Sequence, residues 1–141
     1  MTISGSRGNA VFRKEVAAVE WNDWKWQFRN RIRSLGQLAA LQGCPVSDLA
    51  SCESVLRTYP VAITPYYLSL LDSTDEKDPL RRQCFPDPRE VTFSLGGVPD
   101  PLDEDRFMPL PGLIRRYSDR CLAMVTGTCA LYCRHCNRKR L

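Results

Sequence analysis

The sequence predicts a mixed α/β chain in which a helical first part leads, through a proline-rich connector, to one strand and a cysteine-rich loop. Three observations predict this order. Apolar residues recur at helical spacing after Trp21, seven prolines fall between residues 72 and 111, and three cysteines crowd behind the apolar run from Cys121 to Thr126. A length of 141 residues suits one ordinary domain.

The first helix is expected from about Trp21 to Ala40. Asn22 can serve as its N-cap, and Asp23 complements the positive end of the helix dipole. An apolar stripe with charged residues turned away from it marks an amphipathic helix, and we expect the three tryptophans of this region to pack in the core. The stripe consists of Trp24, Phe28, Ile32 and Leu35.

Two shorter helices should follow. Pro45 ends the first helical region, and Ser47 with Asp48 can open a second helix that runs to about Arg57. Thr64 as N-cap and Pro65 at the first helical position announce a third helix, with Tyr66 to Leu71 as its body.

The segment from Asp72 to Pro111 should connect these helices to the cysteines, because its prolines prevent any long regular element. A short strand is expected around Val91 to Leu95, where Gly96 and Gly97 end it. The continuous apolar run from Cys121 to Thr126 is more typical of a buried parallel strand than of a half-exposed one.

Composition and charge narrow the functional classes. No apolar run approaches the length that crosses a bilayer, and the first ten residues lack the apolar region of a secretory signal. We therefore expect a cytoplasmic protein without a membrane partner, with a transit peptide carrying Arg7 and Arg13 as the alternative.

The net charge is +4, and basic residues gather near the end. They are Arg115, Arg116, Arg120, Arg134, Arg138, Lys139 and Arg140.

A basic end suits anionic ligands, and nucleic acid is the competing interpretation. No stacking aromatics are interleaved among the terminal arginines, so we expect no nucleic-acid partner.

Seven cysteines without an export signal favour metal binding over a disulfide framework. Four are scattered singly and are expected to be small buried hydrophobes: Cys44, Cys52, Cys84 and Cys121. The other three are Cys129, Cys133 and Cys136, spaced CxxxCxxC.

Three local thiolates favour a 4Fe-4S cluster in which one iron stays open for chemistry. The alternative is a zinc site completed by His135 or by a distant cysteine. The chain holds no second CxxC and no HxxxH, and His135 is adjacent to Cys136, so both could hardly ligate one tetrahedral ion.

The cysteine spacing, with Tyr132 before the second cysteine, resembles the signature of radical S-adenosylmethionine enzymes. The wider context resembles lysine 2,3-aminomutase from Trp21 onward. The segments that carry this resemblance are Trp21–Gln27, Ile63–Leu68, Asp78–Gln83, Asp100–Leu102, Pro111–Leu113, Arg116–Tyr117, Asp119–Arg120 and Cys133–Cys136.

The resemblance implies the opening portion of a larger enzyme. Pattern and resemblance together divide the chain into a flexible N-terminus (1–20), a helical domain with its proline-rich connector (21–110), and the start of a radical S-adenosylmethionine partial (β/α) barrel with its cluster loop (111–141). Most of the barrel and the lysine that holds pyridoxal phosphate would lie beyond Leu141, so we expect this chain alone to be inactive.

The resemblance also implies roles for individual residues. Arg138 matches the arginine that binds the substrate carboxylate, whereas Arg116 and Tyr117 match positions near pyridoxal phosphate. Tyr132 and His135 match residues close to the adenine of S-adenosylmethionine, and the three crowded cysteines match the cluster ligands.

The implied function is the shift of the amino group of L-lysine from carbon 2 to carbon 3, with a 4Fe-4S cluster, S-adenosylmethionine and pyridoxal 5'-phosphate as cofactors. The implied partners are a small amino-acid substrate, a reductant such as flavodoxin or ferredoxin, and further copies of the full-length chain. The alternatives are a glutamate 2,3-aminomutase or related radical enzyme, a zinc-binding module, and a helical interaction fragment that assembles with a separately encoded remainder.

Overall fold

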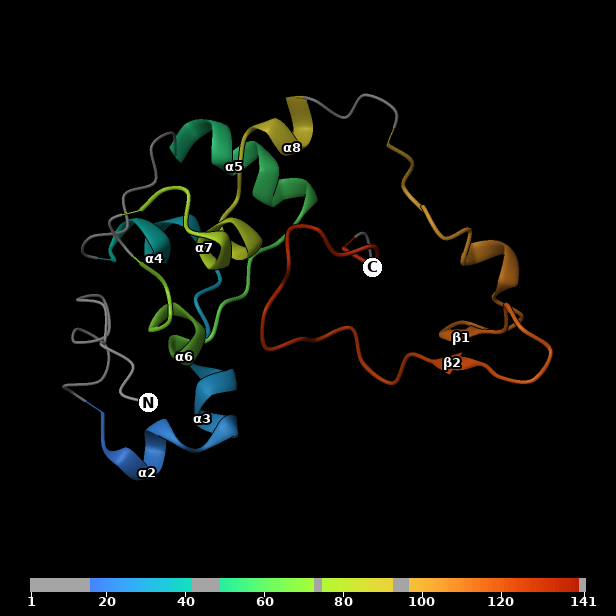
Figure 1. The fold of residues 1–141 in the computed structure, drawn as a ribbon, viewed down its shortest axis with the longest axis horizontal. Helices are drawn as coiled ribbons and strands as arrows, with labels where there is room; N and C mark the ends of the chain where they lie inside the picture. Colours follow the sequence, from blue (N-terminus) through green and yellow to red (C-terminus); the bar gives the residue numbers. More distant parts are fainter. Residues whose placement is uncertain (1–15, 42–48, 73–74, 93–96, 140–141) are drawn as a thin grey trace.

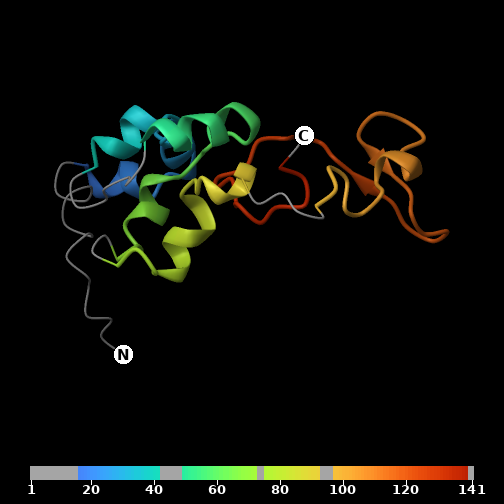
Figure 2. The same ribbon diagram turned by 90° about the horizontal axis from the view of Figure 1, so that it is seen from above.

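The computed structural model describes residues 16–41, 49–72, 75–92 and 97–139. The described residues form the short helices α2 to α8 at one end and a small lobe with β1 and β2 at the other (Figure 1). The same separation is seen from above in Figure 2. The elements are α2 (Ala18–Trp21), α3 (Trp24–Arg29), α4 (Leu35–Ala39), α5 (Leu49–Thr58), α6 (Pro65–Leu68), α7 (Pro79–Cys84), α8 (Arg89–Thr92), η1 (Asp105–Phe107), β1 (Leu113–Ile114) and β2 (Leu122–Ala123).

The single helix expected over Trp21–Ala40 is wrong, because three short helices occupy this region. Asp23, not Asn22, caps α3, and its carboxylate accepts the backbone N–H groups of Lys25 and Trp26 at 2.9 and 3.2 Å. Ser34 opens α4 in the same way. Between α3 and α4 the backbone is extended at Ile32, where it exchanges hydrogen bonds with Ile63 of 2.8 and 3.1 Å.

The expectation that all three tryptophans pack in the core is also wrong. Trp21 is buried, whereas Trp24 is 68% exposed and contacts Phe28 edge to face. Gln27 takes the buried position on α3 instead. Its side chain donates to the Trp21 carbonyl at 2.9 Å and accepts the backbone N–H of Tyr66 at 2.8 Å, which joins α3 to α6.

The second and third helices are confirmed within the described residues. The second is α5, and its expected start at Ser47 and Asp48 lies outside the part of the chain that is described. The third is α6, where the Thr64 hydroxyl accepts the N–H of Tyr67 at 3.3 Å and Pro65 takes the first position. It ends at Leu68 instead of continuing to Leu71.

The connector carries more helix than the prolines predict. Asp78 caps α7 with Pro79 at its first turn, a start signal of the same type as Thr64-Pro65. The strand expected at Val91–Leu95 is wrong for its described residues, because Val91 and Thr92 belong to α8. Within the described residues, no helix is long and apolar enough to cross a membrane.

The core lies among the helices. Ile63 and Leu38 are completely buried at its centre, and Leu131, from the segment that carries the cysteines, packs against it. Cys84 belongs to this core and Cys52 is also buried, which confirms two of the four expected small hydrophobes; Cys44 lies outside the described residues. The buried members of the cluster are Leu38, Val61, Ile63, Leu68, Leu71, Cys84 and Phe85.

The buried parallel strand expected at Cys121–Thr126 is wrong. Only Leu122 and Ala123 are extended, and they pair antiparallel with β1 in the register Leu113 to Ala123 and Ile114 to Leu122. β2 is exposed and Val125 is 92% exposed. Cys121 is exposed as well, so its expected burial is wrong. Within the described residues no further strand lies beside this pair, and most of the apolar run stays exposed.

Candidate functional site

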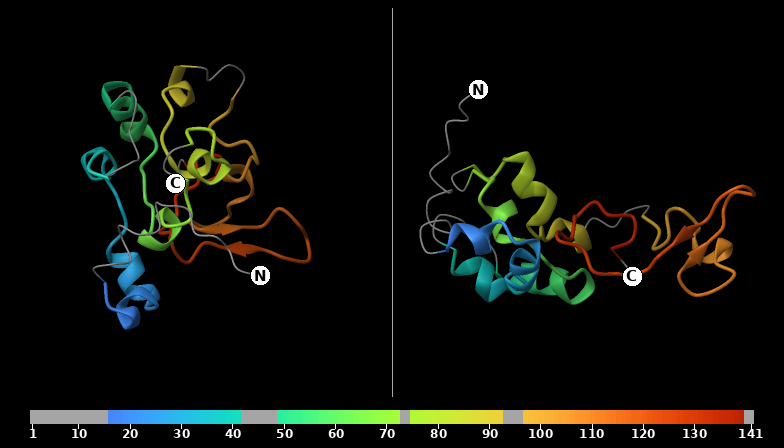
Figure 3. Two further views of the ribbon diagram at one scale, coloured as in Figure 1. Left: turned by 60° about the vertical axis from the view of Figure 1, so that its left-hand side comes forward. Right: turned by 90° about the horizontal axis from the view of Figure 1, so that it is seen from below.

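The cysteine segment, residues 129–136, returns from the two-stranded lobe and lies against the helices (Figure 1; two further views in Figure 3). Leu131 forms an antiparallel bridge with Ile63, and the backbone N–H of Tyr132 donates to the Ala62 carbonyl at 2.9 Å. Ile63 also pairs with Ile32, so three remote stretches of chain meet at this residue. The cysteine segment is therefore docked on the helical core.

Arg31 holds the first end of the cysteine segment. Its Nη1 donates to the carbonyl of Cys129, and its Nε donates to the carbonyl of Phe28 at 2.9 Å. The guanidinium carbon lies 3.8 Å from the centre of the Phe28 ring, a cation–π contact. Burial, and then the charge of Arg33, lower the pKa of Arg31 below its ordinary value.

Arg134 holds the middle of the cysteine segment. It is buried, and its guanidinium forms an ion pair of 2.9 Å with Glu90 of α8. The same group donates to the carbonyls of Tyr59 and Pro60 at 3.4 and 3.0 Å. Its backbone N–H donates to the Gln83 carbonyl at 2.7 Å.

The three thiols differ in their surroundings. Cys129 and Cys136 are exposed, whereas Cys133 is half-buried. Burial raises the pKa of the Cys133 thiol, and negative charge on Cys136 and Cys129 raises it further. The chemistry of these donors fits a soft metal centre.

The thiols do not form a closed metal site as they stand. Among the described residues, no three His, Cys, Asp or Glu side chains lie close enough together to hold a metal ion. His135 is exposed beside Cys136. Binding a cluster would therefore require the exposed Cys129 and Cys136 thiols to turn toward Cys133.

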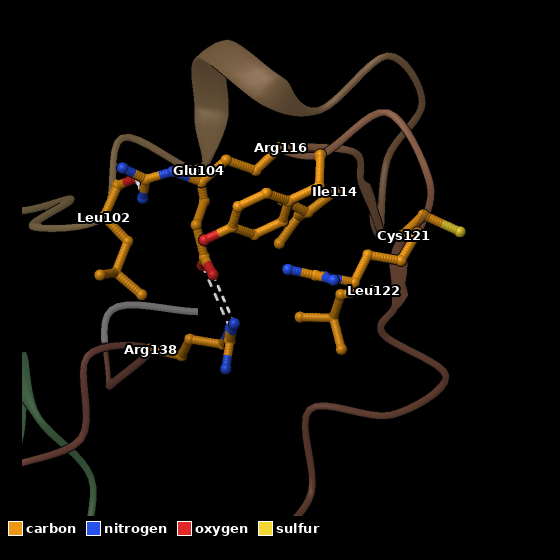
Figure 4. Close-up of a pocket in the computed structure, with 9 residues that line it drawn as sticks. Leu102, Glu104, Ile114, Arg116, Cys121, Leu122 and Arg138 are labelled. Atoms are coloured by element: carbon orange, nitrogen blue, oxygen red, sulfur yellow. Dashed lines mark hydrogen bonds and ion pairs between the residues drawn. The ribbon is translucent and has the colours of Figure 1, made fainter.

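A cavity of about 350 Å³ lies beside the end of the cysteine segment, between the segment around η1, the β1–β2 pair and Arg138. Figure 4 shows its lining side chains. It brings together three residues that the sequence predicts to be functional, Arg116, Tyr117 and Arg138. The full lining is Leu102, Glu104, Ile114, Arg116, Tyr117, Arg120, Cys121, Leu122 and Arg138.

Glu104 is the only acidic residue that lines this described cavity, and it is buried. The Arg138 guanidinium forms an ion pair with it through both carboxylate oxygens, one of them at 3.1 Å (Figure 4). The backbone N–H of Arg138 donates to the sulfur of Cys136 at 3.4 Å. Arg138 thus links the cavity to the cysteine segment.

Two further arginines line the cavity. Arg116 donates to the Leu102 carbonyl at 2.8 Å, and the guanidinium of Arg120 lies 4.3 Å from the centre of the Tyr117 ring. Arg120 is ion-paired with Asp119 at 3.3 Å and Arg138 with Glu104, so three guanidinium groups meet two carboxylates. The remaining positive charge suits an anionic ligand. From the sequence, Arg120 is expected only as a member of the basic group near the end of the chain, and Glu104 is assigned no role. The signal for Arg120 is its place next to Asp119 in one of the family-like segments.

Tyr132 and His135 do not line the cavity. Tyr132 is half-buried where its backbone meets Ala62, and His135 is exposed. The five predicted non-cysteine residues therefore divide into two groups, one beside the cysteines and one around the cavity, with Arg138 adjoining both.

Comparison with known proteins identifies relatives. The chain is 42% identical to L-lysine 2,3-aminomutase of Clostridium subterminale over 127 residues, which cover 90% of this chain and 30% of that protein. It is 43% identical to L-lysine 2,3-aminomutase of Acetoanaerobium sticklandii over 92% of this chain and 31% of that protein. Glutamate 2,3-aminomutase of Clostridioides difficile is 36% identical over 86% of the chain and 28% of its own length.

No protein-family model matches the chain. The chain spans about 30% of the length of the curated relatives it matches. The resemblance to lysine 2,3-aminomutase that the motifs predict is confirmed, and it extends over about nine-tenths of this chain.

Proposed function

Starting from this homology to lysine 2,3-aminomutases, we propose that the chain is the cluster-binding and S-adenosylmethionine-binding portion of a radical aminomutase that converts L-lysine to L-β-lysine. The observation that carries the proposal is the docked cysteine segment. Its three thiols lie within one stretch of eight residues, and the helical core holds that stretch through main-chain and side-chain contacts.

Cys129, Cys133 and Cys136 would hold a 4Fe-4S cluster. Three thiolates would anchor three of its irons and would leave one iron free for S-adenosylmethionine. When bound, the cluster would supply the electron for reductive cleavage of S-adenosylmethionine. Tyr132 and His135, which flank Cys133 and Cys136, would contact the adenine.

The cavity around Arg138 would receive the other ligands. A guanidinium fork pairs well with phosphate and carboxylate oxygens. Arg116, with Tyr117 and Arg120, would bind the phosphate of pyridoxal 5'-phosphate, and Arg138 would bind the substrate carboxylate. Glu104 already pairs with Arg138, so an incoming carboxylate would have to compete with it.

The glutamate enzyme is the second candidate, favoured by the 36% identity to a glutamate 2,3-aminomutase. Both substrates present the same amino and carboxylate groups, so the contacts proposed for Arg138 serve either one. A reductant such as flavodoxin or ferredoxin, and association of full-length copies, complete the proposal.

The 141-residue chain by itself is expected to be inactive. Cys129 and Cys136 are exposed, and a reactive radical needs a site from which water is excluded. The relatives are about three times as long as the part that this chain matches, which would provide the enclosing walls.

The test is a chimera in which this chain replaces the matching part of the Clostridium subterminale enzyme. Under strict anaerobiosis, with cofactors and reductant supplied, amino-acid analysis should detect β-lysine from the chimera and none from the isolated chain. A folded, cluster-loaded chimera that converts L-glutamate but not L-lysine would favour the second candidate. Conversion of neither substrate would contradict the proposal.

A further inference from the structure

Arg134 lies between two cysteines of the CxxxCxxC motif, yet its side chain turns away from them into the helical region. It is 8% exposed, whereas the side chains of Arg120 and Arg138 are 64% and 40% exposed. The sequence groups Arg134 with the basic residues near the end of the chain. The structure gives it a different environment from the exposed members of that group.

All three nitrogens of the Arg134 guanidinium donate hydrogen bonds, to acceptors on different segments of the chain. Nε and Nη2 each donate to Glu90 at 2.9 Å, and Nη1 donates to the Pro60 carbonyl at 3.0 Å. Lys139 also reaches Glu90 at 3.4 Å and donates to the Arg134 carbonyl at 3.1 Å. A buried charge is tolerated only when it is paired and hydrogen-bonded. Removing one partner of the pair leaves an uncompensated buried charge, which destabilises the region around it.

These contacts fix the backbone between Cys133 and Cys136. The peptide N–H of Arg134 donates to Gln83 of α7 at 2.7 Å, while Tyr132, two positions earlier, donates to Ala62. The side chain of Arg134 then joins the same stretch to α8 through Glu90. Cys133 thus lies between two main-chain attachments and beside one buried ion pair.

We propose that Arg134 is a positioning residue for the metal-binding thiols, and that it acts through Glu90 to hold the cysteine segment against the helical region. The inference rests on the proposed cluster-binding function. Arg134 itself touches no cofactor or reacting atom; its role is to present Cys133 in a fixed place toward which Cys129 and Cys136 can close.

The first experiment measures docking of the cysteine segment in the metal-free full chain. Each thiol is alkylated with iodoacetamide under native conditions, and the rate at each cysteine is followed by mass spectrometry. In Arg134→Ala, Cys133 should react about tenfold faster or more, as expected when the ion pair that holds a local region is broken. The buried Cys52 and Cys84 report on global unfolding and should stay slow.

The matched control is Arg89→Ala. Arg89 neighbours Glu90 on α8 and is also paired, with Asp87, but its side chain is 66% exposed. Its loss should leave the Cys133 rate unchanged within about twofold, as for most exposed ion pairs. Equal Cys133 rates in the two variants, with Cys52 and Cys84 protected, would overturn the proposal.

Two further variants test the same contact if Arg134→Ala does not fold. Arg134→Lys retains the charge but loses the fork, and it should give a Cys133 rate between those of the wild type and a Glu90→Ala variant. The double variant Glu90→Ala, Arg134→Lys should react no faster than Glu90→Ala alone, because the two residues act as one unit. Additive effects would refute action through Glu90.

The second experiment separates this inference from the proposed function. Anaerobic reconstitution should give fewer clusters per chain in folded Arg134→Lys than in Arg89→Ala, and an altered electron paramagnetic resonance signal of the reduced cluster. If the wild type takes up no cluster, the proposed function fails, and the positioning role for metal-binding thiols fails with it even where the alkylation rates support docking. If Arg134→Lys loads a wild-type cluster with an unchanged signal, only the positioning role fails.

Discussion

Replacing Ile63 with alanine should weaken the junction between the helical core and the cysteine segment. The Ile63 side chain is completely buried, and its backbone pairs with Ile32 and Leu131. Transfer of the lost apolar groups costs roughly 0.8 kcal/mol per methylene, and the cavity left behind adds to this. We expect a loss of about 3–4 kcal/mol in the free energy of unfolding, within the range measured for Ile→Ala in cores.

The assay is equilibrium urea unfolding of the metal-free chain, followed by far-UV circular dichroism and tryptophan fluorescence. The midpoint should fall while the slope of the free energy of unfolding against urea stays unchanged, because that slope scales with the surface exposed on unfolding and one side chain changes this surface little. The matched control is Val125→Ala, since Val125 is 92% exposed; its effect should be within about 0.5 kcal/mol. A cost below about 1 kcal/mol for Ile63→Ala would show that the described packing around this residue is wrong.

Three other predictions concern the site and its surroundings. Alanine at any one cysteine of the cysteine segment should abolish cluster loading, measured as iron and sulfide per chain, whereas the cluster should survive alanine at Cys52, Cys84 or Cys121. Arg116→Ala should weaken binding of pyridoxine 5'-phosphate by about tenfold, measured by calorimetry, as expected for one lost charged hydrogen bond, whereas Arg106→Ala, outside the cavity, should not. The hydrogen bond from Arg89 lowers the pKa of Asp87, so the stabilisation is present at neutral pH and is lost as pH falls through that lowered pKa. Carbon-13 NMR should place the Asp87 midpoint below that of an ordinary aspartate, and Arg89→Ala should raise it; an unchanged midpoint would contradict the assigned contact.

Local start signals could be predicted from the sequence because they act over a few residues. Thr64 with Pro65 marks the beginning of α6, and the Thr64 hydroxyl caps the helix by accepting the N–H of Tyr67, three residues further along the chain. The same rule, applied to Asp78 and Pro79, would have found α7. An interpretation of prolines as helix breakers alone misses α7, because proline is also favoured in the first turn of a helix.

Tertiary pairing overrode the predicted helix over Trp21–Ala40. Helical spacing includes Ile32 in the apolar stripe, but Ile32 pairs instead with Ile63, 31 residues further along the chain, in an extended backbone. Periodicity cannot report such a contact, because it records only which residues share a face if the helix forms. The strand expected at Cys121–Thr126 is wrong for a related reason, since an apolar run is buried only where other elements cover it.

The candidate site, too, could be predicted from the sequence only in part. Cys129, Cys133 and Cys136 could be selected from spacing, and the resemblance supplied Arg116, Tyr117 and Arg138, which the fold places around one cavity. The roles of Glu104 and Glu90 could not be predicted, because their arginine partners are remote in the sequence. Glu104 lies 34 residues before Arg138, and Glu90 lies 44 residues before Arg134. The resemblance selected Arg138 but gave Arg134 no role, because the burial of Arg134 and its ion pair with Glu90 are visible only in the structure.

The most direct test of the account is metal and sulfide analysis of the chain after anaerobic reconstitution with iron and sulfide. Three thiolates on the docked cysteine segment predict about four iron and four sulfide per chain, and addition of S-adenosylmethionine should change the electron paramagnetic resonance spectrum of the reduced cluster. Stoichiometric zinc without sulfide in anaerobically purified protein, together with no uptake of iron, would contradict the account.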